Sequence, residues 1–305
     1  MTASRFLRQP SLLIGLAIVA LFAAVALAAP LIAPPQGRSP DVIPRDGFSA
    51  QPLPPGDDHP FGTTQSQNDI FYGVIWGTRA AFRIGVLVTL GRLLIGGLVG
   101  LVAGYQGGWV DALLMRITDA FLAFPVIAAV MVMLAVFGNV IELLGSGDQM
   151  FMLRRVEIVI TVALVLFGWM PYARMIRGNA LSEREKEYMQ AARASGVPGR
   201  RILFRHLLPN VTQGIFVLSA SDVGAMVVLV SALNFIGFGA GTMGEMPAEW
   251  GQLLSVSRNW IVGAGGNAFR YWFTFVPVSL AVVLFAVGWN LIGDGLRDAF
   301  DPRTK

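Results

Sequence analysis

Few side chains in this 305-residue chain have the types and spacing that enzyme chemistry needs. Asp222 lies inside an apolar run, and Arg116 and Asp119 stand three positions apart on one predicted helix. Either feature could serve a membrane-embedded enzyme, but no nucleophile–base pair, H-E-x-x-H motif or G-x-S-x-G elbow accompanies them. The absence of cysteine also excludes thiolate chemistry and disulfides. We therefore interpret the chain as non-catalytic, with no catalytic residues.

The sequence also contains no motif for binding ATP or a metal. A Walker A loop needs Gly-Lys followed by Ser or Thr, whereas neither Lys186 nor Lys305, the only lysines, follows a glycine. The two histidines, His59 and His206, lie far apart, which argues against a histidine-rich metal site. We expect no cofactor and no metal in this chain, so energy for any pumping must come from another protein.

The most unusual stretch is polar and runs from Glu183 to Asn210, between two long apolar runs. It reads EREKEYMQAARASGVPGRRILFRHLLPN and carries the densest positive charge of the chain. Helix formers dominate up to Ser195, and neither proline nor glycine interrupts them. Gly196 can cap the end of this first helix, and Pro198 is well placed to begin a second.

One face of that first helix is made of small side chains. It consists of residues that recur at i, i+3, i+4 and i+7: Tyr188, Ala191, Ala192 and Ser195. Small side chains allow another backbone to come close, so this face suits docking into a groove of a partner protein. The alternative is a basic amphipathic loop that lies on anionic lipid, which the arginines of the stretch would favour.

The composition indicates an integral membrane protein. The chain is 54% hydrophobic and 14% charged, whereas a soluble domain carries about a quarter charged residues. The formal net charge of +4 is therefore better explained by loop topology than by binding to nucleic acid.

The apolar runs predict an all-α membrane protein with six spanning helices, each near the roughly 20 residues that a bilayer needs. The predicted spans are about residues 11–33, 80–105, 112–137, 156–172, 211–238 and 271–292. Although Ala26–Ala29 resembles a signal-peptidase site, we expect the first span to remain uncleaved because its apolar run is long.

Several residues inside the spans predict how the helices pack. Gly96, Gly100 and Gly104 recur every fourth residue, the spacing that lets membrane helices approach closely. Arg83 and Arg92 should face other helices, water or the interface, because an arginine exposed to lipid is costly.

The sequence also predicts structural roles for Asp222, for the pair of Arg116 and Asp119, and for Pro125. Asp222 should line a cavity or have a partner. We expect Arg116 and Asp119 to form a structural ion pair rather than a proton relay. Pro125 is expected to kink the third span, because it removes a backbone donor.

Residues Glu187–Asn210, Glu-Tyr-x-x-Ala-Ala-Arg-Ala-x-Gly…His-x-Leu-Pro-Asn, resemble the "EAA" cytoplasmic loop of ABC importer permeases. The similarity is to the C-type subunit of the dipeptide/oligopeptide and nickel transport family. Further family-like wording lies at Gly104–Pro125, Leu233–Gly239, Pro247–Gly251 and Asn290–Arg303. The resemblance covers nearly the whole chain and is weakest over residues 34–60, which we expect to be an exposed irregular loop, and over 138–155. The sequence departs from the family at Thr64, Gln67 and Asn68, where Asp, Gly and Arg are usual, and at Val230, where an acid is common.

This resemblance implies a type I ABC importer permease fold, with an N-terminal tail, helix and loop over residues 1–79 and a permease core over 80–305. A coupling helix at about 183–208, between helices 4 and 5, would dock on an ATPase. The implied docking residues are Tyr188, Ala191, Ala192, Ser195, Gly196 and Arg200. The pathway-lining candidates are Asp222, Ser231 and Asn234.

The implied partners are a second similar permease, two cytoplasmic ATPase subunits that bind ATP, an extracytoplasmic substrate-binding protein and the lipid of a bacterial or archaeal inner membrane. Basic residues gather on the side that holds both termini and the Glu183 loop, which places that side in the cytoplasm. Peptides are the default cargo, with nickel, opines or oligosaccharides as alternatives. An ion-coupled carrier would be expected to show inverted repeats, and we find no convincing repeat.

Overall fold

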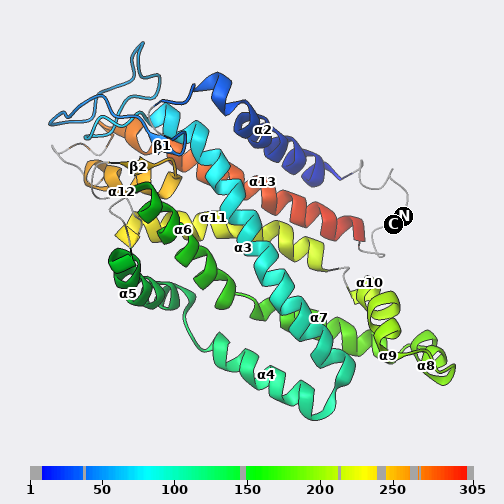
Figure 1. Cartoon of the computed structure of the whole chain (residues 1–305). Helices are drawn as coiled ribbons and strands as arrows, with labels where there is room; N and C mark the ends of the chain where they lie inside the picture. Colours follow the sequence, from blue (N-terminus) through cyan, green and yellow to red (C-terminus); the bar gives the residue numbers. More distant parts are fainter. Residues whose placement is uncertain are drawn as a thin grey trace.

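The structure, a computed structural model, describes residues 9–36, 39–144, 149–211, 214–238, 245–261, 267 and 269–300. Helices dominate these residues and are arranged as an elongated bundle (Figure 1). The α-helices are α2 (Pro10–Ile32), α3 (Ile70–Gln106), α4 (Gly108–Leu122), α5 (Val126–Leu144), α6 (Gln149–Leu166), α7 (Met170–Arg184), α8 (Glu187–Ala194), α9 (Gly199–Arg201), α10 (Leu208–Val211), α11 (Ile215–Leu233), α12 (Trp250–Ile261) and α13 (Val276–Phe300). The shorter elements are the π-helices η1 (Ile202–Leu207) and η2 (Asn234–Phe238), the 3-10 helix η3 (Trp272–Thr274) and the strands β1 (Val42–Ile43) and β2 (Met246–Pro247).

The predicted all-α membrane architecture is confirmed, with a correction to the third span. Among the described residues, five helical segments are long and apolar enough to cross a membrane, and a bent pair could add a sixth. That pair is α4 and α5, whose axes differ by 79°. The break falls immediately before Pro125, whose missing N–H cannot continue the helical ladder. The expected kink is therefore a sharp turn between two helices.

Three other span boundaries differ from the predictions. The second span begins at Ile70 rather than near Ala80, because Asp69 caps α3 by accepting from the Tyr72 backbone N–H at 2.9 Å. The fourth continues through α7 to Arg184. The last begins at Val276, because the residues before it form the 3-10 turn η3.

Helix α3 runs through the middle of the bundle and packs closely on α7, as the glycine spacing predicts (Figure 1). A Cβ added at Gly96 or Gly100 would overlap the carbonyl oxygen of Trp169 or Ala173, and one at Gly104 would overlap the Ala180 methyl group. The three glycines therefore allow backbone-to-backbone contact along the interface.

This contact predicts different results for two neighbouring glycines. Gly100→Ala should destabilise the protein by about 1–3 kcal/mol, the usual cost of overpacking, because Ala173 backbone occupies the space. Gly97→Ala should be neutral or stabilising, because its Cβ would lie 3.6 Å from Ile176 Cδ1, an ordinary contact. Thermal unfolding of both variants in detergent checks this, and equal shifts would contradict the packing.

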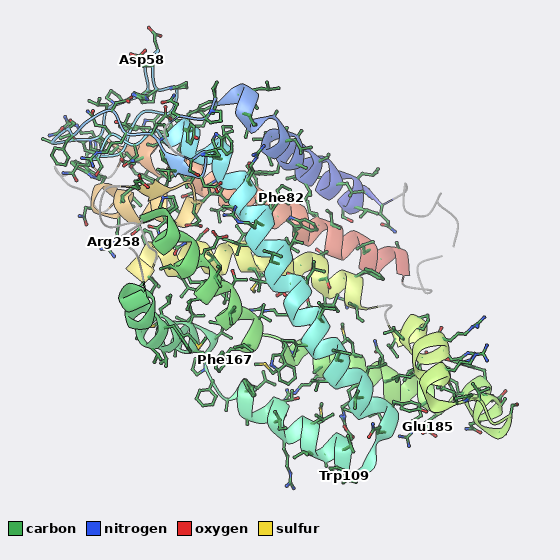
Figure 2. The ribbon with its side chains drawn as sticks, viewed as in Figure 1. Asp58, Phe82, Trp109, Phe167, Glu185 and Arg258 are labelled. Atoms are coloured by element: carbon green, nitrogen blue, oxygen red, sulfur yellow. The ribbon has the colours of Figure 1, made fainter. Side chains whose placement is uncertain are left out.

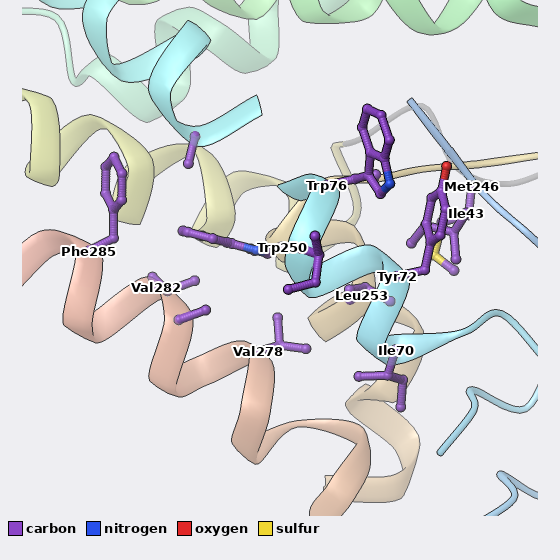
Figure 3. Close-up of a cluster of buried hydrophobic side chains, with 14 of the residues drawn as sticks. Ile43, Ile70, Tyr72, Trp76, Met246, Trp250, Leu253, Val278, Val282 and Phe285 are labelled. Carbon is purple, nitrogen blue, oxygen red and sulfur yellow. The ribbon is translucent and has the colours of Figure 1, made fainter. Parts of the chain in front are cut away.

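The end of the bundle farthest from α8 holds the largest hydrophobic cluster (Figure 3). Trp250 and Phe285 pack edge to face there, with ring centroids 5.8 Å apart. Strands β1 and β2 pair antiparallel, with Ile43 opposite Met246, and so join the loop after α2 to the segment before α12. Trp76 Nε1 donates to the Ala33 carbonyl at 2.9 Å, which ties α3 to the end of α2.

The described part of the loop after α2 is largely irregular, as predicted, apart from β1, and side-chain contacts hold the segment between this loop and α3. His59 contacts the carboxylates of Asp69 and Asp46 through its two ring nitrogens, at 2.9 and 3.2 Å. Thr64 and Asn68, two of the departures from the family pattern, are buried and bond each other, with Thr64 Oγ1 donating to Asn68 Oδ1 at 3.2 Å.

The third departure, Gln67, adopts a left-handed φ of 58°. A glycine, usual at this position in the resembled family, has no Cβ to clash in that conformation. The change to glutamine is therefore accommodated with some backbone strain, and the turn closes with Gln67 N–H donating to the Thr64 carbonyl at 2.9 Å.

Candidate functional site

The first helix of the polar stretch begins later in the sequence than predicted. Glu183 and Arg184 complete α7, and α8 starts at Glu187. The predicted glycine cap is confirmed, because Gly196 has φ +70° and the Val197 N–H donates to the Ala192 carbonyl at 3.1 Å. This hydrogen bond and left-handed glycine form a Schellman ending.

The second predicted helix starts as expected and then changes form. Pro198 precedes α9, and its carbonyl accepts from the Arg201 N–H at 2.8 Å and the Ile202 N–H at 3.1 Å. From Ile202 the chain is π-helical as far as Leu207, which the sequence did not indicate. Helix α10 then leads toward the fifth span.

A buried cluster fixes α8 to the rest of the chain. Met189 of α8 is fully buried and belongs to a cluster that also contains Ile176 of α7, Leu101 of α3 and Ile202 and Leu207 of η1. The same cluster contains Ile215 of α11. Because Ile176 belongs to the fourth span and Ile215 to the fifth, α8 is anchored to both spans.

Polar contacts fix α8 as well. Tyr188 Oη donates to Glu183 Oε2 at 2.7 Å, and Asn210 Nδ2 donates to Tyr188 Oη at 3.2 Å. Loss of hydration, followed by the hydrogen bond to Glu183, raises the pKa of Tyr188 to about 12. The hydroxyl is therefore a neutral donor at physiological pH, and it links the end of α7 to α8 and α10.

The six predicted docking residues differ in how exposed their side chains are. Tyr188 is 39% exposed, and Ala191, Ser195 and Gly196 are exposed too. Ala192 is half-buried and packs against the chain's own cluster. The side chain of Arg200 lies outside the described residues. We call Tyr188, Ala191 and Ser195 the docking face; it lies at the end of the molecule that carries Glu185, opposite Asp58 (Figure 2).

Asp222, a candidate for the pathway, is instead held in an ion pair between helices. Arg92 Nη1 donates to Asp222 Oδ1 at 3.0 Å, and Tyr172 Oη donates to Oδ2 at 3.2 Å. Arg92 Nε also donates to the Leu164 carbonyl at 2.9 Å. The two charged side chains are 6% and 13% exposed. The expectation that Asp222 and Arg92 need partners is confirmed, and their contacts join α3, α6, α7 and α11.

A cavity of about 380 Å³ lies among α3, α6, the start of η2 and the segment before α12. Its polar and charged lining comprises Asp41, Arg83, Glu157, Thr161, Asn234, Glu249 and Gln252. Arg83 pairs with Glu157 through two hydrogen bonds of 2.8 and 2.9 Å, so the expected partner of Arg83 is found. Of the three pathway candidates, Asn234 lines this cavity, and Asp222 and Ser231 are not among its lining residues.

The prediction that Arg116 and Asp119 form an ion pair is wrong. Asp119 accepts a hydrogen bond from Arg174 of α7 at 2.6 Å. About two turns earlier on α4, Asp111 accepts from Arg177 Nη2 of α7 at 2.7 Å. The acids of α4 therefore bind arginines of α7, because the bend at Pro125 lays α4 against that helix.

Comparison with known proteins shows two family matches. A family model described as "Binding-protein-dependent transport system inner membrane component" matches residues 96–305. A second, described as "N-terminal TM domain of oligopeptide transport permease C", matches residues 1–55.

Several curated proteins are similar over most of the chain. A dipeptide transport system permease protein of Alkalihalophilus pseudofirmus is 34% identical over 296 residues, which cover 96% of this chain and 86% of that protein. An oligopeptide transport system permease protein of Mycobacterium tuberculosis is 33% identical and covers 99% of this chain and 93% of its own. A glutathione transport system permease protein of Pectobacterium atrosepticum is 34% identical, with coverages of 82% and 75%.

Proposed function

The chain belongs to the family of binding-protein-dependent transport system inner membrane components, and we propose that it forms half of the translocation path of an ATP-driven peptide importer. Its relatives, which are named as dipeptide, oligopeptide and glutathione transport permeases, support a peptide cargo over nickel, opines or oligosaccharides. The partners in this proposal are a second similar permease, two cytoplasmic ATPase subunits and an extracytoplasmic substrate-binding protein.

The observation that carries the proposal is the way α8 is mounted. Its inner side, at Met189, is fixed in a cluster shared with α7 and η1, and its docking face is exposed. A rigid element held from both sides can pass a displacement to the spans attached to it. We infer that movement of the ATPase subunits shifts α8, and that α7 and α11 follow as a rigid-body switch between outward and inward exposure.

The character of the docking face favours a protein partner over a lipid surface. Its three residues contribute a phenol, a methyl group and a hydroxyl, and none of them is basic. The Ser195 hydroxyl is already occupied by the Ala191 carbonyl, to which it donates at 2.9 Å. A face with small, internally bonded side chains fits a close groove, whereas binding to anionic lipid depends on exposed basic side chains.

Orientation follows from the same proposal. The described ends of α2 and α13 near the two termini lie toward one end of the bundle, away from the loop with Asp58 (Figures 1 and 2). We propose that this end and α8 are cytoplasmic, because basic residues in the sequence gather there.

Reconstitution tests the proposed function. The chain should co-purify in detergent with its ATPase subunits, and proteoliposomes of the assembly with the binding protein should take up a labelled dipeptide only when ATP is supplied. An excess of unlabelled dipeptide should compete, whereas Ni²⁺ and a trisaccharide should not. Uptake that persists without ATP, or that follows an imposed proton or sodium gradient, would indicate an ion-coupled carrier instead.

A further inference from the structure

The cavity beside α12 is lined by aliphatic side chains, among them Ile84, Leu87 and Val162, and by polar ones. Asn234 and Glu249 belong to this lining and contact each other, and we call them the acceptor pair. Asn234 Nδ2 donates to Glu249 Oε2 at 2.6 Å, and the Gln252 backbone N–H donates to the same oxygen at 2.9 Å. These contacts hold the carboxylate in place at the start of α12.

Asn234 carries an acceptor that the described protein leaves unused. The residue is 5% exposed, and its Oδ1 has no hydrogen-bond partner among the described residues. Because Nδ2 is engaged by Glu249, rotating the amide would not satisfy both ends. A buried amide oxygen without a donor is unfavourable, and such groups in folded proteins usually have a partner. A ligand that brings a donor to this position would be favoured.

The charged side chains around the cavity favour a positively charged ligand. Among the described lining residues, Glu157 and Glu249 supply two carboxylates and Arg83 supplies one guanidinium, and Asp41 is an acid with an interaction of its own. The guanidinium is already engaged by Glu157 through two hydrogen bonds. Burial, with a smaller contribution from nearby Glu157, raises the pKa of Glu249. The two donors that bond its Oε2, the Asn234 amide and the Gln252 backbone N–H, are both neutral.

We propose that this cavity binds a primary ammonium group on a small apolar body, with the Glu249 carboxylate and Asn234 Oδ1 as its acceptors. The ammonium supplies a positive charge and hydrogen-bond donors to the acceptor pair, and the aliphatic lining residues accommodate the rest of the ligand. This inference rests on the proposed function, in which the ligand is the amino end of a peptide passing through the membrane.

Two small probes separate the ammonium from the apolar body. Leucinamide carries both, whereas N-acetyl-leucinamide keeps the side chain and lacks the charge. We expect calorimetric titration of the detergent-solubilised complex near neutral pH to show leucinamide binding about ten- to a hundredfold more tightly, the range for a hydrogen-bonded charge. Equal affinities, or tighter binding of the acetylated probe, would overturn the inference.

Two variants test whether Glu249 and Asn234 are the acceptors that bind the ammonium group. Glu249→Gln and Asn234→Leu should each weaken leucinamide binding at least about tenfold and leave N-acetyl-leucinamide unaffected. Asp119→Asn, which removes an exposed carboxylate that is not among the lining residues, should bind as the wild type does. If Glu249→Gln does not assemble, Asn234→Leu decides alone. Wild-type affinity in the assembled variants would refute the site.

The uptake assay on the same preparations distinguishes this inference from the proposed function. ATP-driven dipeptide uptake by wild type, combined with leucinamide binding that ignores Glu249 and Asn234, would remove the ammonium site and leave the importer intact. A wild-type assembly that takes up no peptide would instead refute the proposed function, and with it this inference.

Discussion

Ala191→Glu is expected to abolish association with the ATPase subunits and ATP-driven uptake together. Ala191 is exposed on α8, so the new carboxylate should leave the chain folded and reach only the partner. A bulky charge at the centre of a close interface costs roughly 2–4 kcal/mol. That corresponds to a roughly 30- to 700-fold loss of affinity. Co-purification of the ATPase with the tagged chain and peptide uptake in proteoliposomes measure the two effects.

The control places the same change at the other end of the molecule. Gly56 lies exposed in the loop after α2 with no atom within 4 Å of an added Cβ, so Gly56→Glu should retain both ATPase and uptake. Normal co-purification of the Ala191→Glu chain, at matched expression, would contradict the docking role.

Ala192 and Gly196 are also among the docking residues that the family resemblance implies, and the structure shows why Ala191 is the better position for this test. Ala192 packs against the chain's own cluster. Gly196 has a left-handed φ of +70°. A bulky charged residue at either position should lower co-purification and uptake, but it would also disturb the fold.

Asp222→Ala should strongly destabilise the transmembrane bundle. It leaves the Arg92 guanidinium buried between helices without its carboxylate, and breaking a buried pair from one side costs about 3–5 kcal/mol. It also removes the acceptor of the Tyr172 hydroxyl. We expect a large drop in the thermal unfolding temperature in detergent and a low yield of folded protein.

A second pair between the same residue types provides the control. Arg174 and Asp119 are 55% and 60% exposed, so Asp119→Ala should cost only about 0–1 kcal/mol. Replacing both buried partners, as Arg92→Met with Asp222→Leu, should recover most of the stability that Asp222→Ala loses, because no unpaired charge remains. Equal losses for the two aspartates would show that the buried pair is not structural.

Local features of the fold could be predicted from the sequence. The spacing of Gly96, Gly100 and Gly104 predicted a close contact, and Gly196 predicted the end of α8, because both depend on residues near each other in the chain. The partner of Asp222 could not be predicted, since Arg92 lies 130 positions away and pairing depends on how α3 and α11 pack. For the same reason the pair of Asp119 with Arg174 was missed.

The two candidate sites also differ in how much of each could be predicted from the sequence. The family-like wording of residues 187–210 was sufficient to find the polar stretch, but periodicity alone could not show that Ala192 faces inward, because it stands at the edge of its face. The cavity brings together Asp41, Arg83, Glu157 and Glu249 from four segments. Asn234 was the only candidate among its lining residues, and the available signal for Glu249 was an acid next to a tryptophan within family-like wording.

Cross-linking gives the most direct test of the central claim, that the docking face of α8 contacts an ATPase subunit. The chain contains no cysteine, so a single introduced thiol is the only cross-linking position on it. Ser195→Cys in the assembled complex, labelled with a maleimide that carries a short photoreactive group and then irradiated, should form a covalent product with the ATPase, whereas Asp58→Cys at the opposite end should form none. A product from Asp58→Cys and none from Ser195→Cys would contradict the account.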